Sequence, residues 1–241
     1  MTRFLMSAML AVGTLGAWLV VPDAARAEDR RYSVSNFERL RVEGAFEVRL
    51  VTGKPSSGQA EADVDTLDRL TLTVDGTTLT VRLSANGWGE RPRIRRGTVP
   101  IVTLTTPMVR SVLVNGGGRL MITGLKAERA DLAVNGAGAI TVTGIAADQL
   151  NTTVIGTGAI SLAGKAQRAQ LLTNGSGTVD AAGLDVGDLT VRLDGPGQTR
   201  AAARFTATVT NTGLGQIDIA GSPACTVKAP AGGVVTCGKA N

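Results

Sequence analysis

Two aspartates and the arginine between them are the residues of this chain whose spacing could support chemistry on a sugar. Asp180, Arg200 and Asp218 recur at intervals of 20 and 18 residues. Glycoside hydrolases use two carboxylates that face each other across the scissile bond. The 241-residue sequence has no histidine and only 3% aromatic residues, so it lacks a histidine general base and aromatic sugar platforms. We therefore expect no enzymatic activity, and a carbohydrate-active β-helix enzyme is the alternative.

The sequence contains only two cysteines, Cys225 and Cys237. In an exported chain, two cysteines this close in sequence most simply form one disulfide. We expect this bond to stabilise the last part of the fold. Two thiolates without a histidine do not make a closed tetrahedral zinc site. We therefore expect no metal and no cofactor.

A cluster of arginines precedes Val99 and contains Arg91, Arg93, Arg95 and Arg96. Such a cluster could contact an anionic glycan, a lipid headgroup or a phosphate. We favour a solvated loop, with anion contact as the alternative. The net charge is only +5 and its charges are scattered, which gives no basic face of the kind that nucleic acid requires.

The feature that must position all of these residues is an internal repeat of about 20 residues. A Gly-x-Gly unit recurs in steps of 20, 20, 19, 20 and 18 residues. The first glycines of these units are Gly116, Gly136, Gly156, Gly175, Gly195 and Gly213. Repeats of this period are typical of solenoids. We expect each unit to be one coil of the solenoid.

Side chains between the glycines alternate as they do in β-strands. Two columns follow the glycines, one containing Leu120, Ile140 and Ile160, and the other Ile122, Val142 and Leu162. Residues two apart in a strand share a face, so both columns should point inward and Thr141 outward. Columns that recur at fixed offsets predict an all-β parallel β-solenoid. A series of antiparallel hairpins is the alternative.

The residue before each glycine pair helps the chain turn sharply. Asparagine, aspartate and glycine tolerate the backbone conformations of tight turns. We expect a structural turn at the pairs Asn115-Gly116, Asn135-Gly136, Asn174-Gly175 and Asp194-Gly195, and also at Gly156 and Gly213. Stacked asparagines could form a hydrogen-bonded ladder, which Ile155 would interrupt. Each unit precedes a strand, so these glycines do not form a nucleotide-binding loop.

The ends of the sequence differ from the repeats. Residues 1–27 have a basic start, an apolar middle and an Ala25-x-Ala27 ending, which is typical of a secretory signal peptide. A membrane anchor is the alternative reading. We expect a mature solenoid at 28–241, with no membrane span after cleavage. It divides into irregular, wider coils at 28–108, regular repeats at 109–221 and a C-terminal cap at 222–241. A separate small β domain is the alternative for the irregular part.

With the repeats laid out, the chain resembles the auto-transporter adhesin head domain family, also called the head GIN domain. The resemblance rests on the segment from Phe37 to Val48 and on the later Gly-x-Gly coils. It covers about residues 32–238. It implies an exported bacterial β-helical protein and brings no catalytic residues. We expect a binding, adhesion or structural module that is periplasmic, extracellular or on the cell surface. An envelope glycan or protein is the partner we consider.

Overall fold

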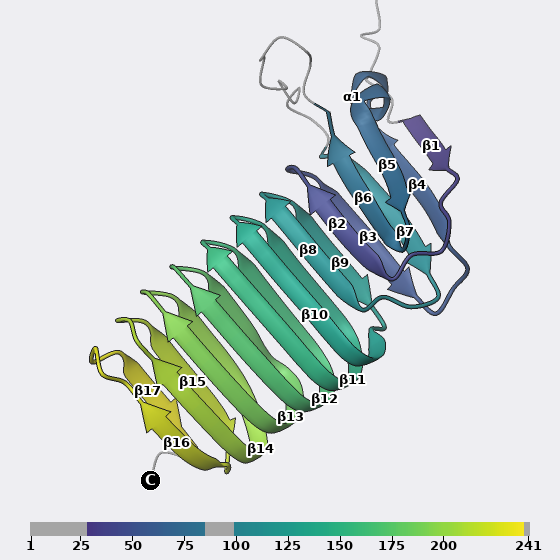
Figure 1. Cartoon of the computed structure of the whole chain (residues 1–241). Helices are drawn as coiled ribbons and strands as arrows, with labels where there is room; N and C mark the ends of the chain where they lie inside the picture. The colour runs from purple at the N-terminus through teal and green to yellow at the C-terminus, as the bar shows by residue number, and fades with distance from the viewer. Residues whose placement is uncertain (1–27, 85–98, 239–241) are drawn as a thin grey trace, which may run out of the picture.

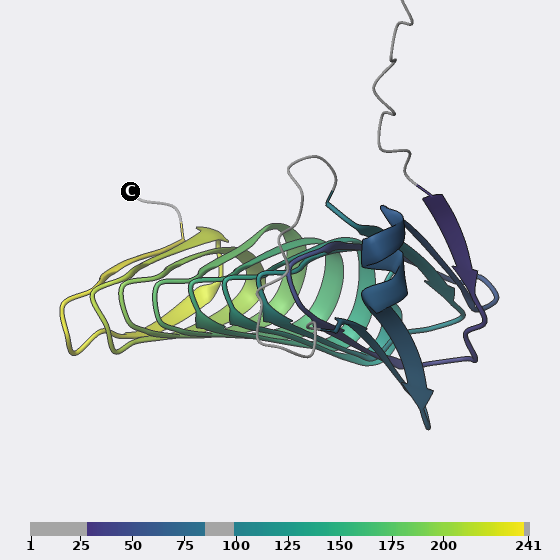
Figure 2. The same ribbon diagram turned by 90° about the horizontal axis from the view of Figure 1, so that it is seen from above.

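A computed structural model of the chain describes residues 28–84 and 99–238, in which flattened coils of β-strand stack side by side (Figures 1 and 2). In each regular coil, one strand segment precedes the glycine corner and another follows it. The preceding segments form what we call the first sheet, and the following segments form the second sheet. The hydrophobic core lies between the two sheets, and this confirms the predicted all-β solenoid.

The regular coils pair in parallel with one another. Leu120 pairs with Ile140, and Ile140 pairs with Ile160. This register excludes the hairpin alternative for the repeats. The strands of this part are β8 (Ser111–Gly116), β9 (Arg119–Thr123), β10 (Lys126–Gly136), β11 (Ala139–Gly156), β12 (Ala159–Asn174), β13 (Thr178–Asp194), β14 (Gln198–Asn211), β15 (Gln216–Gly221), β16 (Ala224–Lys228) and β17 (Val234–Cys237).

The predicted inward columns form the core. Ile140 and Val142 are each 1% exposed, whereas Thr141 between them is exposed. Burying an aliphatic side chain of this size contributes about 1.5–3 kcal/mol. A single coil cannot bury its own inward face, so neighbouring coils must supply the cover.

Tight packing of the glycine corners explains why they require glycine. Gly136 has a φ of +110°, which side chains rarely adopt. A Cβ at Gly138 would lie 2.8 Å from Val114 Cγ1 and 2.9 Å from the carbonyl oxygen of Gly118. The first glycine of the unit thus supplies the turn, and the second allows the coils to approach.

The opposite corner of each coil is looser. Strands β11 to β14 run through this corner without a break, so the two sheets are continuous there. The register shifts at this corner between β11 and β12, between β12 and β13, and between β13 and β14. Such shifts are β-bulges, which bend a strand and redirect its side chains.

The N-terminal part contains two coils whose order in space differs from their order in sequence. The first coil is formed by β2 (Arg39–Glu43) and β3 (Glu47–Thr52), and the second by β6 (Thr78–Leu83) and β7 (Ile101–Thr106). Strand β2 pairs with both β6 and β8, and β3 pairs with both β7 and β9. The first coil therefore lies between the second coil and the regular repeats.

Antiparallel strands complete this end of the stack, which the sequence analysis did not anticipate. They are β1 (Glu28–Tyr32), β4 (Ser57–Ala62) and β5 (Leu70–Asp75). Asp75-Gly76 turns the β5–β6 hairpin, in which Asp75 pairs with Thr78.

A short helix, α1 (Val64–Arg69), lies at the N-terminal end beside β4 and β5 (Figure 1). Asp63 caps it by accepting hydrogen bonds from the Thr66 amide at 2.9 Å and the Thr66 hydroxyl at 2.8 Å. Burial raises the pKa of Asp63, but these hydrogen bonds outweigh it and hold the pKa below its ordinary value. Leu67 on the same helix is 1% exposed and packs into the core.

The C-terminal end is closed by the expected disulfide between Cys225 and Cys237. Cys225 on β16 pairs with Ala207 of the first sheet, and Cys237 on β17 pairs with Ile219 of the second sheet. Both partners are buried core residues. The disulfide therefore joins the two sheets at the end of the stack, where Val235 also packs against the core.

Candidate binding face

Outward side chains of the first sheet stand in columns, because adjacent coils are in register. One column contains Arg129, Gln149, Arg168 and Asp188 in successive coils. A neighbouring column contains Asp131, Asn151, Gln170 and Thr190. The two columns together present cations, amides and carboxylates on adjoining strands.

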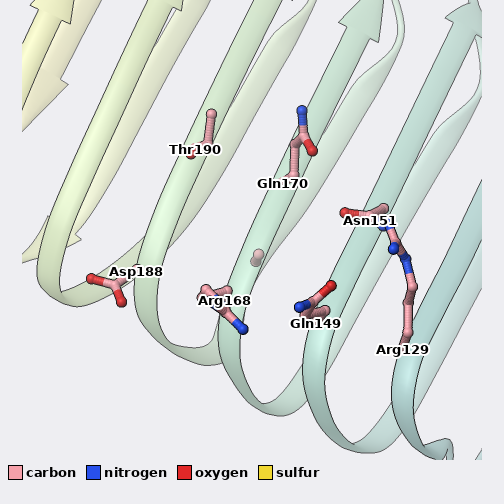
Figure 3. A pocket seen from close by; sticks show the side chains of 8 residues that line it. Arg129, Gln149, Asn151, Arg168, Gln170, Asp188 and Thr190 are labelled. Carbon is pink, nitrogen blue, oxygen red and sulfur yellow. The ribbon is translucent and has the colours of Figure 1, made fainter.

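These columns line a shallow depression of about 310 Å³ (Figure 3). Figure 3 shows Gln149 and Arg168 side by side on neighbouring coils, near the looser corner, and Arg129 extending toward Asn151. The residues that line the depression are Arg129, Gln149, Asn151, Arg168, Ala169, Gln170, Asp188 and Thr190. We call this surface the polar face. Because it is open, it suits a ligand that lies across the coils.

Several charges on the polar face and next to it are already paired within the protein. Asp131 accepts a hydrogen bond from Asn151 Nδ2 at 2.7 Å, and its Oδ1 lies 3.8 Å from Arg129 Nε. Asp188 accepts a hydrogen bond from the Thr206 hydroxyl at 2.6 Å. For Arg168, by contrast, residues 28–84 and 99–238 provide no carboxylate within 4.0 Å.

A second depression, of about 370 Å³, lies around the looser corner beside the polar face. Gln167 Nε2 donates to Asp148 there at 2.9 Å, and Arg204 Nε lies 2.9 Å from Asp185 Oδ1. The ring of Phe205 is 62% exposed, with the Arg204 guanidinium 5.1 Å from its centre. A bulge in β14 directs this ring outward, since Arg204 and Phe205 together oppose the single residue Gly187.

Asp180, Arg200 and Asp218 share one column on the outer side of the second sheet. Asp180 pairs with Arg200, which pairs with Asp218. Asp180 accepts a hydrogen bond from the Ala182 amide at 3.1 Å, and Asp218 accepts one from Gln216 Nε2 at 2.9 Å. The two carboxylates stand two coils apart with a cation between them. The three residues form a charged ladder on this outer surface.

The glycine corners place their residues in similar stacks. Asn135 Nδ2 donates to Asn115 Oδ1 at 3.2 Å. Ile155 occupies the next step of this stack and is 50% exposed. Positive φ angles occur at Gly116, Gly136, Gly156, Gly175 and Gly195, and not at Gly213. The turn residues Asn174 and Asp194 pair with each other in the same stack.

Two sequence predictions lie outside the described residues. They are the signal peptide at 1–27 and the arginine cluster of Arg91, Arg93, Arg95 and Arg96. Across residues 28–84 and 99–238, no helix has the length and apolar character needed to cross a membrane. In the same ranges, no cluster of cysteine and acidic side chains could hold a metal ion.

Sequence reasoning missed the polar face itself. The residues of the polar face stand at a constant distance before an inward residue of each coil. Arg168, for example, stands three residues before Leu171. Aligning the outward positions of the repeats, as was done for the glycines, would have placed Arg129, Gln149 and Arg168 in one column.

A family model described as "Putative auto-transporter adhesin, head GIN domain" matches residues 36–223. The chain belongs to this family. No curated protein matches the sequence. Membership of this adhesin family and the disulfide both favour an exported protein.

Solved structures of the same fold come from Bacteroides and Parabacteroides species. A putative adhesin from Bacteroides fragilis is 21% identical, with a TM-score of 0.78 over 89% of this chain and 97% of that chain. A putative lipid binding protein from Parabacteroides distasonis is 18% identical, with a TM-score of 0.71 over 90% and 97%. A putative adhesin from Parabacteroides merdae is 18% identical, with a TM-score of 0.66 over 90% and 97%. At these identities the likeness shows the fold alone.

Proposed function

We propose that this head GIN domain protein is an exported, non-catalytic binding module that uses the polar face to attach to a polymer of the cell envelope. The observation that carries the proposal is the polar face, where Arg168, Gln149 and Gln170 stand in register across adjacent coils. In-register columns offer a polar group at each strand spacing, roughly 4.8 Å. An extended polymer with repeated polar groups can contact several coils at once.

The chemistry of the lining favours a hydroxyl-rich ligand over an acyl chain. The depression on the polar face is lined by charged, amide and hydroxyl side chains, together with one alanine. Small-molecule sites are usually concave and mostly apolar, and this open, polar depression lacks that character. An envelope glycan therefore fits the polar face better than a lipid tail does.

The proposal is tested by applying residues 28–241 to an array of bacterial envelope, host and plant glycans. We expect binding without turnover. The same glycans are then incubated with the protein and assayed for new reducing ends and for unsaturated products. Release of either would establish the alternative, a carbohydrate-active β-helix enzyme. Asp180→Asn and Asp218→Asn would then identify whether the charged ladder is its active site.

A further inference from the structure

We infer that Arg168 on the polar face binds the carboxylate of an acidic polysaccharide, which runs along the solenoid axis and crosses successive coils. This inference rests on the proposed binding function and names its ligand class. A carboxylated sugar is the occupant that matches both the charge and the hydrogen-bonding groups of the polar face.

The charge argument begins with the difference between the two arginines of the column. The carboxylate of Asp131 lies 3.8 Å from Arg129. Arg168 is exposed and, in the described ranges, no carboxylate approaches it within 4.0 Å. A guanidinium presents a planar fork of donors that matches a carboxylate with two parallel hydrogen bonds. Arg168 is therefore the first point of attachment for an anion.

The neighbours of Arg168 identify the rest of the ligand as a sugar. Gln149 precedes Arg168 in its column, and Gln170 lies two residues further along the same strand. Neither amide has a side-chain hydrogen bond to another described residue. Each offers two donors and one accepting oxygen, which suits the hydroxyl groups around a pyranose ring. A simple inorganic anion would leave these amides unused.

The in-register column sets the direction of the polymer. Arg129 and Arg168 are two coils apart, roughly 10 Å at one strand spacing per coil. A polymer lying along the column meets these two cations, with the amide of Gln149 between them. Asp188 follows in the next coil, where its carboxylate can accept a hydrogen bond from a hydroxyl of the next sugar.

The test compares acidic polymers with their neutral derivatives. Polygalacturonate, alginate and hyaluronate are immobilised alongside carboxyl-reduced forms of the same polymers, with dextran sulfate as a polyanion of different chemistry. Binding of residues 28–241 is measured by biolayer interferometry at several salt concentrations. We expect at least one carboxylated polymer to bind at least tenfold more tightly than its reduced form, because hydrogen bonds to charged groups are the strong ones.

Arg168→Gln is the decisive variant, and Arg200→Gln is its matched control. Arg200 is also an exposed arginine in a column, but it lies on the second sheet. We expect Arg168→Gln to weaken binding about tenfold and Arg200→Gln to change it less than twofold. Circular dichroism confirms that both variants are folded.

Three outcomes would overturn the inference. If neutral glycans bind and none of the carboxylated polymers binds better, the ligand class is wrong while the binding function stands. If both variants weaken binding equally, or dextran sulfate binds equally well, the attraction is a general charge effect. If no glycan of any kind binds, the proposed function fails together with the inference.

Discussion

The two ends of the solenoid solve the same problem with different chemistry. A stack of coils has an outermost layer whose inward side chains lack a neighbour. At the N-terminal end, antiparallel strands β4 and β5 and the helix α1 supply that neighbour, and Ala60, Leu67 and Leu70 on these elements are buried. At the C-terminal end, the cover is the Cys225–Cys237 disulfide, and every residue of β16 is exposed.

The difference shows how many residues each solution requires. Apolar closure needs large side chains and a surrounding structure that holds them, which here takes three strands and a helix. Covalent closure needs only two short strands, because the bond itself holds the two sheets together. The N-terminal end should therefore depend on packing, and the C-terminal end on redox conditions.

We expect the largest loss in free energy of unfolding in the coils between the two ends, because neither closure covers those coils. Ile140→Asp places an unpaired carboxylate in the interior, where burying a charge is expensive. The loss in free energy of unfolding should exceed the roughly 2–5 kcal/mol that truncation of a buried isoleucine costs. Thr141→Asp, on the outer surface, should change it by at most about 0.5 kcal/mol. Equal losses in urea unfolding would contradict the assignment of faces.

Leu67→Ala tests whether packing closes the N-terminal end. Leu67 on α1 is 1% exposed, and truncation of a buried leucine costs about 2–5 kcal/mol. The control is Val64→Ala, because Val64 on the same helix is 49% exposed and its truncation should cost about 0.5 kcal/mol or less. Chemical denaturation of both variants gives the comparison. A cost for Leu67→Ala no greater than that of the control would show that apolar packing does not hold this end.

Cys237→Ser tests the covalent closure at the other end. The disulfide joins residues 12 apart in sequence, and opening a loop of this size should cost about 3 kcal/mol in the chain-entropy model. Hydrogen exchange should accelerate first in β16 and β17, and exchange in α1 should not change. A melting temperature equal to that of the wild type would mean that β16 and β17 are held by strand pairing alone.

Asp63→Ala tests the helix cap at the N-terminal end and should cost about 1 kcal/mol near neutral pH. Since the pKa of Asp63 is lowered by folding, its stabilisation is present above the ordinary aspartate pKa and is lost as pH falls through the folded value. The difference from wild type should therefore shrink below about pH 4. Asp63→Asn, which keeps an acceptor, is the control. A difference independent of pH would argue against the charged cap.

The smallest expected effect is a gain in stability within the regular coils. The hydroxyls of Thr152, Thr173 and Thr199 are buried without a hydrogen-bond partner among the described residues. Thr152→Val keeps the shape and removes the unpaired group, which should add roughly 0.5–1 kcal/mol. Thr153→Val, on the outward side of the same strand, should add nothing. A loss on Thr152→Val would indicate that its hydroxyl has a partner in solution.

The regular coils could be predicted from the sequence because the spacing of their apolar residues determines the register. Ile140 has to lie beside Leu120 and Ile160, since any other register would separate the apolar columns. The N-terminal order could not be read in the same way. Leu40 and Val42 pair equally well with Leu79 and Val81 on one side and with Val112 and Val114 on the other. The spacing of Leu40 and Val42 does not indicate that both neighbouring strands are present at once.

The candidate site was harder to predict from the sequence, for a related reason. Outward residues such as Gln149 and Arg168 stand at the same position of the repeat but differ in type from coil to coil, so no shared residue type marks their column. The open depression depends on side-chain size and on the bulges of the looser corner, and neither follows from alternation alone. The Asp180–Arg200–Asp218 column was visible because its charges are conspicuous in the sequence.

The position of the first coil limits how this protein can change in length. Strands β2 and β3 have neighbours on both sides, with β6 and β7 on one side and β8 and β9 on the other. The stack therefore extends from an internal starting layer, with the second coil on one side and all the regular coils on the other. Duplication or loss of a 20-residue coil between β9 and β15 would leave both closures intact. A coil added before β2 would have no free edge to join.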